Sequence, residues 1–175
     1  MKVVLGATLA IPFLVVSLLA AGEPKPAPPA PVPAQILAGK TVFIVNDGAD
    51  RGANPDAPFS GEPERAYNDF YAAMKAWGHY ELVGSPSGAD LLLELRFTVR
   101  PGLVERGQTW YWDGRFRLAI RDQKSHAKLW TLTEQVERAL LQGNRDKNFD
   151  QALARLVADM QRLTAPSTAG TPNGQ

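Results

Sequence analysis

Residues 89–136 read ADLLLELRFTVRPGLVERGQTWYWDGRFRLAIRDQKSHAKLWTLTEQV, and this stretch decides the fold. Apolar and polar side chains alternate over three successive runs. The apolar members are Leu91, Leu93, Leu95, Phe97 and Val99, then Trp110, Trp112, Phe116, Leu118 and Ile120, then Trp130, Leu132 and Val136. A period of two with one apolar and one polar face is typical of half-buried antiparallel strands. The stretch therefore predicts a three-stranded meander with one face toward a core and one toward solvent.

Two more strands and two helices are expected around this meander. Residues 40–45 are β-branched and apolar on both faces, which predicts a strand inside the sheet, and residues 79–83 predict a second strand. Residues 63–77 and 148–163 carry apolar side chains at helical spacing. The sequence thus predicts an α+β domain. Its sheet is mainly antiparallel but mixed, of about five strands in β-α-β-β-β-β-α order, with two helices packed on one face.

The amino-terminal segment, residues 1–22, has the features of an export signal. Lys2 precedes a long apolar run that ends in Ala20-Ala21-Gly22, small residues suited to cleavage. If the segment is kept, its apolar run is close to the ~20 residues that span a bilayer, and it is the chain's one expected membrane contact. In both cases we expect an exported domain, periplasmic or extracellular.

Composition marks the remaining boundaries. Residues 23–38 are rich in Pro and Ala and are expected to form a linker, because such a tract favours extended polyproline II structure. Residues 39–164 form the expected single α/β domain. Residues 165–175 have the composition of a disordered tail.

Charge and cysteine content restrict the function. The chain has 19 Lys and Arg against 18 Asp and Glu, and loss of residues 1–22 removes only Lys2, which leaves 18 against 18. This balance gives no electrostatic reason to expect nucleic acid as a partner. The absence of cysteine excludes disulfides, thiolate catalysis and a lipid anchor through cysteine.

No catalytic or cofactor motif is found. His79 and His126 are the only histidines, and nothing in the sequence brings them together. A Gly-x-Ser-x-Gly elbow, a dinucleotide fingerprint and a phosphate loop are all missing, and no four-ligand metal set is evident. We expect no enzyme activity, no cofactor and no metal.

The polar face of the sheet is the first candidate site. Its candidate partner-binding residues are Tyr111, Arg115, Arg117 and Arg96. Acidic residues alternate with these arginines, which favours a solvated face of mixed charge over an anion-binding face. An aromatic residue among charges is typical of a protein contact.

The loop at residues 47–62 is the alternative site. A small-ligand or hydrolytic site there would use Asp47, Asp50, His79 and Glu81. The acidic spacing does not match a calcium-binding loop, so a solvated loop is the plainer interpretation.

Two local motifs carry a resemblance to known domains. One is Gly88-Ala89-Asp90 leading into Leu91–Leu95, and the other is Leu118–Asp122, a turn, then Lys128-Leu129-Trp130. The pattern resembles small bacterial envelope domains: uncharacterised, usually lipidated families, the amino-terminal domain of TolB, and the lipoprotein activators of penicillin-binding proteins. The resemblance implies a non-enzymatic domain that binds or assembles with an envelope protein or cell-wall component. It assigns no catalytic residue.

Overall fold

The computed structural model describes residues 30–50, 58–103 and 110–165, without the side chains of residues 49, 50, 103 and 110. The predicted signal, most of the linker and nearly all of the tail lie outside these ranges. The folded unit begins at Pro31 and is described by itself below.

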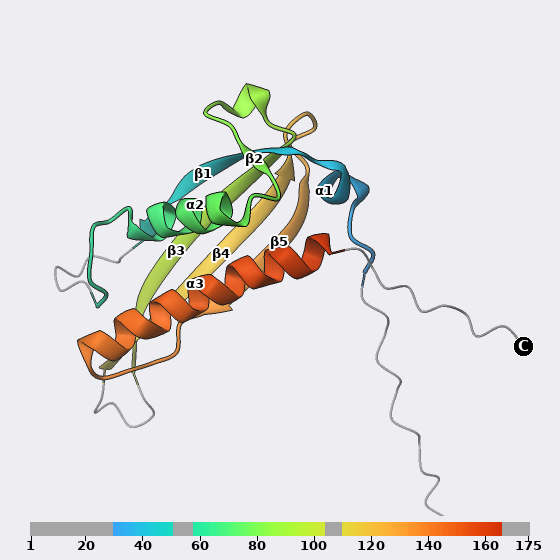
Figure 1. Ribbon diagram of the computed structural model, residues 1–175. Coiled ribbons are helices and arrows are strands. Elements are labelled where there is room, and N and C mark those ends of the chain that lie inside the picture. Colours follow the sequence, from blue (N-terminus) through green and yellow to red (C-terminus); the bar gives the residue numbers. More distant parts are fainter. Residues whose placement is uncertain (1–29, 51–57, 104–109, 166–175) are drawn as a thin grey trace, which may run out of the picture. The chain divides into compact units, whose positions relative to one another are not determined.

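A five-stranded mixed sheet forms the centre of the domain (Figure 1). Its strands are β1 (Thr41–Asp50), β2 (Glu81–Leu82), β3 (Leu91–Leu103), β4 (Trp110–Asp122) and β5 (Lys128–Gln135). They lie in the order β2-β1-β3-β4-β5, with β1 parallel to β2 and β3. β3, β4 and β5 form an antiparallel meander. The predicted meander and the internal position of the first strand are both confirmed.

Two long helices, α2 (Arg65–Trp77) and α3 (Gln142–Thr164), cover the same face of the sheet (Figure 1). The predicted α+β class and the two helices on one face are therefore confirmed. A 3-10 turn, η1 (Pro86–Gly88), precedes β3. No helix within the described ranges combines the length and the apolar character needed to cross a membrane.

The core lies between the sheet and the two helices. Its centre is an aromatic cluster in which the ring of Phe116 lies 4.6 Å from that of Phe97 and 4.9 Å from that of Phe149, between centroids. The sheet contributes the buried side chains Leu91, Leu93, Leu95, Val99, Leu118 and Ile120. The helices contribute Phe70 and Met74 from α2, and Leu156 and Met160 from α3. These are the apolar faces that the alternation and the helical spacing predict.

β1 is longer than the sequence predicts. It continues to Asp50, because residues 49 and 50 pair with Phe97 and Thr98 of β3 after a bulge that follows Asn46. Gly48 makes this bulge at φ 85°, and its N–H donates to Asn46 Oδ1 at 3.1 Å. The predicted loop at residues 47–62 is therefore wrong at its start, since a Gly-containing turn signal lies inside a strand here. The second predicted strand is shorter, reduced to Glu81–Leu82.

A short helix, α1 (Ala34–Ala38), occupies part of the stretch expected as linker. Ile36 is fully buried in the core, and Tyr80 Oη donates a hydrogen bond to the Ile36 carbonyl at 3.1 Å. The end of the Pro/Ala-rich tract is thus packed against the domain.

α3 begins at Gln142, six residues before the predicted start at Asn148. Its first turn is fixed by distant residues: Arg145 Nε donates to the Pro58 carbonyl at 2.7 Å, and Asp146 Oδ1 accepts from Ser60 N at 2.8 Å. No local capping signal marks this start, which is why the sequence did not predict it.

Candidate functional site on the outer face of the sheet

The side of β3, β4 and β5 that lies opposite the helices is called the outer face here. Its exposed polar side chains include Arg96, Arg100, Arg115, Arg117, Thr131, Thr133 and Gln135. They alternate with the buried core residues, so each is placed by the two-residue period of its strand. The outer face is therefore available to a partner.

Two arginines oppose each other across this face. In the register of β3 and β4, Arg96 lies directly opposite Arg117. Like charges in this position repel, which destabilises the pair of strands. Arg96 is compensated, because its Nε lies 2.9 Å from Asp47 Oδ2. The guanidinium of Arg117 has no ion pair or hydrogen bond with any residue that the structure describes. Among the described residues, Arg117 is thus a cation without an ion-pair partner.

A polar hollow of about 320 Å³ lies beside this arginine pair. Ala119 has a short side chain, is only 4% exposed, and lies on β4 between Arg117 and Arg121. Arg121 Nε donates to Glu94 Oε2 at 2.8 Å and its Nη1 donates to the His126 carbonyl at 3.1 Å. The lining residues are Asp47, Glu94, Arg96, Arg117, Ala119, Arg121 and Lys128.

The lining of this hollow is unbalanced in charge. Four of its side chains are cationic and two are acidic, which leaves an excess of two positive charges. Lys128, like Arg117, has no acidic partner within the described ranges. The mixture of acidic and basic residues on this face in the sequence predicts a solvated face of mixed charge. The alternation does not reveal that Asp47 pairs with Arg96 and that Glu94 pairs with Arg121. These pairs leave Arg117 and Lys128 without an ion-pair partner among the described residues.

Tyr111, another predicted contact residue, lies at the far end of β4, six residues from Arg117 and thus about 20 Å away. The guanidinium of Arg138 covers its ring at 3.7 Å from the centroid. The ring also lies across Gly102, where an added Cβ would come within 2.3 Å of Tyr111 Cζ. Arg115 lies between the two ends of the face and is 3.7 Å from Asp113. The structure therefore brings Arg96 and Arg117 together, and it places Tyr111 apart from them.

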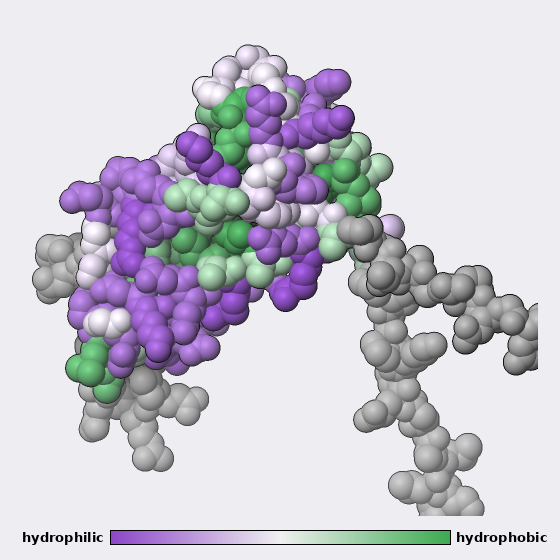
Figure 2. All heavy atoms as spheres, viewed as in Figure 1, coloured by the Kyte–Doolittle hydropathy of each residue, from purple (hydrophilic) through white to green (hydrophobic). Residues whose placement is uncertain are grey.

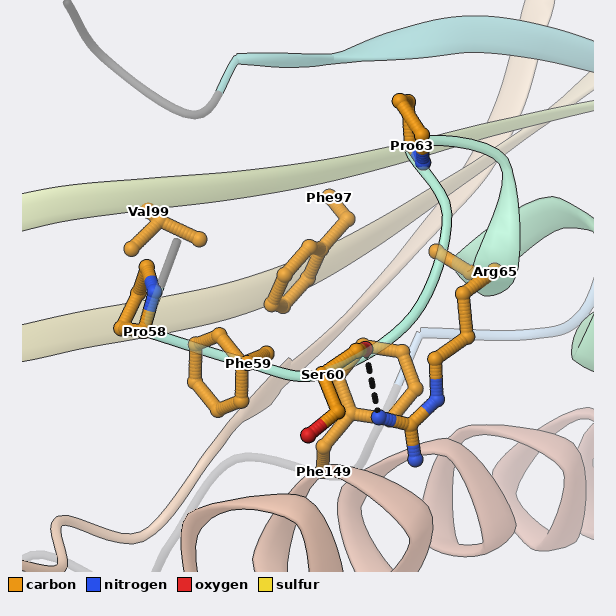
Figure 3. A pocket seen from close by; sticks show the side chains of 9 residues that line it. Pro58, Phe59, Ser60, Pro63, Arg65, Phe97, Val99 and Phe149 are labelled. Carbon is orange, nitrogen blue, oxygen red and sulfur yellow. Dashed lines mark hydrogen bonds between the residues drawn. The ribbon is translucent and has the colours of Figure 1, made fainter. Parts of the chain in front are cut away.

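Residues 51–57 of the alternative loop lie outside the described ranges, and the space beneath residues 58–62 is closely packed (Figure 3). Phe59 points inward from the loop, and its ring lies 5.5 Å from that of Phe97 and 5.8 Å from that of Phe149. The remaining cavity is about 10 Å³, roughly the space for one water molecule. Arg65 bounds it and donates from Nη1 to the Ser60 carbonyl at 3.0 Å (Figure 3).

The four residues of the alternative site do not converge. Glu81 pairs with Thr41 at the start of β1, whereas Asp47 lies six residues further along that strand, about 20 Å away. Asp50 ends β1. His79 is exposed and stacks on Trp77, with 4.8 Å between the ring centroids. In the part of the chain that the structure describes, no three His, Asp or Glu residues are grouped as metal ligands.

A charged cluster that the sequence did not predict holds residues 58–64 in place. Arg65 Nη2 lies 2.6 Å from Asp150 Oδ1, its Nη1 lies 3.1 Å from Asp146 Oδ1, and its guanidinium lies 4.3 Å from the Phe149 ring centroid. Burial acts to raise the pKa of Asp146, but hydrogen bonds from Ser60, Gln142 and Arg65 outweigh it, and the pKa falls below its ordinary value. Arg65 is separated from Asp146 by 81 residues and from Asp150 by 85, so no local pattern in the sequence indicates this cluster.

The helical side has a hollow of its own between α2 and α3, about 520 Å³ in volume. Figure 2 shows its apolar floor as a green strip between two polar helices, and Leu153 and Val157 contribute to it. Both side chains are largely buried, so the strip exposes little apolar surface.

Comparison with known proteins establishes similarity of fold. No protein-family model matches the sequence, and no curated protein matches it. A DUF4136 family protein from Bacteroides thetaiotaomicron is 12% identical with a TM-score of 0.50, over 74% of this chain and 91% of that chain. The hypothetical protein CT253 from Chlamydia trachomatis is 10% identical with a TM-score of 0.50, over 73% and 99%. Lipoprotein GNA1162 from Neisseria meningitidis is 11% identical with a TM-score of 0.41, over 69% and 99%.

The two structures with a TM-score of 0.50 are bacterial proteins, one of a DUF4136 family and one described as hypothetical. The resemblance to small bacterial domains of uncharacterised families is supported at the level of the fold. The finer likeness to the TolB amino-terminal domain and to activators of penicillin-binding proteins stays a prediction.

Proposed function

We propose that this protein is an exported, non-enzymatic domain that binds another envelope component through the outer face of its sheet. The export assignment rests on the signal-like residues 1–22. The observation that carries the proposal is the Arg96–Arg117 pair: two exposed arginines face each other on the uncovered side of the sheet, and one of them has no acidic partner in the described ranges.

The energetics of this pair support a binding role. Like charges directly opposite each other destabilise a sheet by a few tenths of a kcal/mol up to about 1 kcal/mol. Neither the core nor the turns require arginine at position 117, because its side chain points to solvent. A partner that brings negative charge to this face offsets the repulsion, so binding recovers the stability that the isolated sheet loses.

The geometry of the histidines supports a non-enzymatic role. His79 stacks on Trp77 at the β2 end of the sheet, and His126 occupies the turn between β4 and β5 with φ 56°. Neither ring forms a hydrogen bond to a serine or to a carboxylate among the described residues. The arrangement offers no base aligned with a nucleophile.

Site-specific photocrosslinking in cells tests the proposal. A benzoylphenylalanine at Thr133, which is exposed and pairs with Arg117, is expected to capture one dominant envelope component. The same group at Gln151, exposed on α3, is the matched control and is expected to capture nothing specific. Adding Arg117→Ala to the Thr133 variant is expected to reduce capture. Equal capture from both faces, or capture from Gln151 alone, would contradict the proposal.

A further inference from the structure

We propose that the hollow above Ala119 is a binding site for an acidic sugar, a saccharide unit that carries a carboxylate or phosphate group. This inference rests on the proposed function and specifies the chemistry of its ligand. The hollow is the place on the outer face where a small side chain is surrounded by long cationic ones.

The cations are arranged to hold one anionic group. Arg117 and Arg121 flank Ala119 along β4, and Lys128 pairs with Arg121 from β5. Arg121 is hydrogen-bonded to Glu94 and to the His126 carbonyl. Arg117 and Lys128 have no hydrogen-bond or ion-pair partner for their charged groups among the described residues. An anion over Ala119 would lie between these two free cations. Charge-assisted hydrogen bonds of this kind are among the stronger ones in proteins.

The rest of the lining suits hydroxyl groups. Glu94 and Asp47 contribute carboxylate oxygens that can accept hydrogen bonds. Thr131, which pairs with Ala119, and Thr133, which pairs with Arg117, add exposed hydroxyls at the edge of the same area. A ligand with one anionic group and several hydroxyls satisfies both halves of this lining. An acidic sugar has that combination, and an isolated phosphate ion does not.

The form of the site favours a saccharide over a membrane surface or an acidic peptide. The hollow is concave and about 320 Å³ in volume, so it fits one compact unit better than a flat lipid layer. An acidic peptide brings carboxylate side chains but no hydroxyl groups for the carboxylates of Glu94 and Asp47 to accept from.

Binding to defined saccharides by the purified full-length protein tests the inference. In titration calorimetry, galacturonic acid oligomers and glucose 6-phosphate provide a carboxylate arm and a phosphate arm, and neutral galactose oligomers are the ligand control. We expect binding in at least one acidic arm and none to the neutral oligomer. Arg117→Ala should weaken binding at least about tenfold, as loss of a charged hydrogen bond does. Lys147→Ala removes one exposed cation from α3 and should change binding less than about twofold.

A steric variant separates the hollow from diffuse charge attraction. Ala119→Leu leaves every charge in place and fills the floor of the hollow, so it should abolish binding. Thermal unfolding of each variant checks the fold, and Arg117→Lys, which keeps the charge, should retain part of the affinity. Binding unchanged in Ala119→Leu would overturn the inference.

Two other outcomes would also overturn it. One is binding to vesicles of anionic phospholipid or to a polyglutamate peptide when neither acidic sugar binds. The other is capture of a protein at Thr133 in cells with no saccharide binding in vitro, which would leave the proposed function standing. Saccharide binding without any capture at Thr133 would instead support the site and reject a protein partner.

Discussion

Phe116 is the residue on which the core depends most at the residue scale. It is fully buried and contacts the rings of Phe97 and Phe149. Phe116→Ala should destabilise the protein by about 3–5 kcal/mol, through lost burial and the cavity left behind. Trp130 shares the core side but is only partly buried, so Trp130→Ala should cost less. Urea unfolding midpoints measure both, and equal losses would contradict this ranking. The alternation predicted the side of the sheet for both residues, but it did not predict their depth.

Asp146 gives a second prediction at this scale. Its pKa is lowered in the folded protein, so the carboxylate contributes stability above its unfolded pKa of about 3.9 and loses that contribution as the pH falls through its folded pKa. Asp146→Asn should therefore be less stable than the parent at pH 7, and the difference should shrink below about pH 4. Denaturant midpoints at pH 7 and pH 3 measure it. A difference that grows toward low pH would show that the carboxylate does not stabilise the fold.

At the scale of the element, α1 gives a clear test of where the domain begins. Ile36 is fully buried, whereas its neighbour Leu37 is 52% exposed. Ile36→Ala should destabilise the protein by about 2–5 kcal/mol, while the matched Leu37→Ala should cost little. Guanidinium unfolding compares the two variants. If neither substitution changes the guanidinium midpoint, the burial of Ile36 does not stabilise the fold and α1 is a dispensable end of the linker.

Elements with their own periodicity were predictable, and those fixed by distant contacts were not. Leu91 to Val99 alternate because one side of β3 faces the helices, and that pattern is local. The end of β1 depends on its pairing with Phe97, and the first turn of α3 depends on Arg145 and Pro58. α1 has only five residues, too few for helical spacing to appear. Of the candidate site, the sequence predicted Arg96 and Arg117 but not that they face each other, because cross-strand register depends on the turns.

At the scale of the whole molecule, charge is separated and not evenly mixed. The chain carries 19 basic and 18 acidic residues, yet the hollow above Ala119 has four cations and two acids. A net count averages over such a separation, so it argues against nucleic acid as a partner but does not reveal a local cationic site. Raising the salt from about 0.15 M to 1 M shortens the screening length from about 8 Å to 3 Å. Affinity for galacturonic acid oligomers should therefore fall steeply with salt in calorimetry. An affinity that does not depend on salt would show that the exposed cations are not in contact with the ligand.

The bulge in β1 also has a consequence for how the protein behaves when it is crowded. β2 pairs with only Thr41 and Val42, so the rest of that side of β1 has no strand neighbour in the described part of the chain. A straight, unpaired edge is a template on which other chains add and aggregate. Gly48, at φ 85°, bends the edge out of register and removes that template. A bulky residue at position 48 would strain this bulge, because an L side chain rarely adopts that φ, and would favour self-association through the β1 edge.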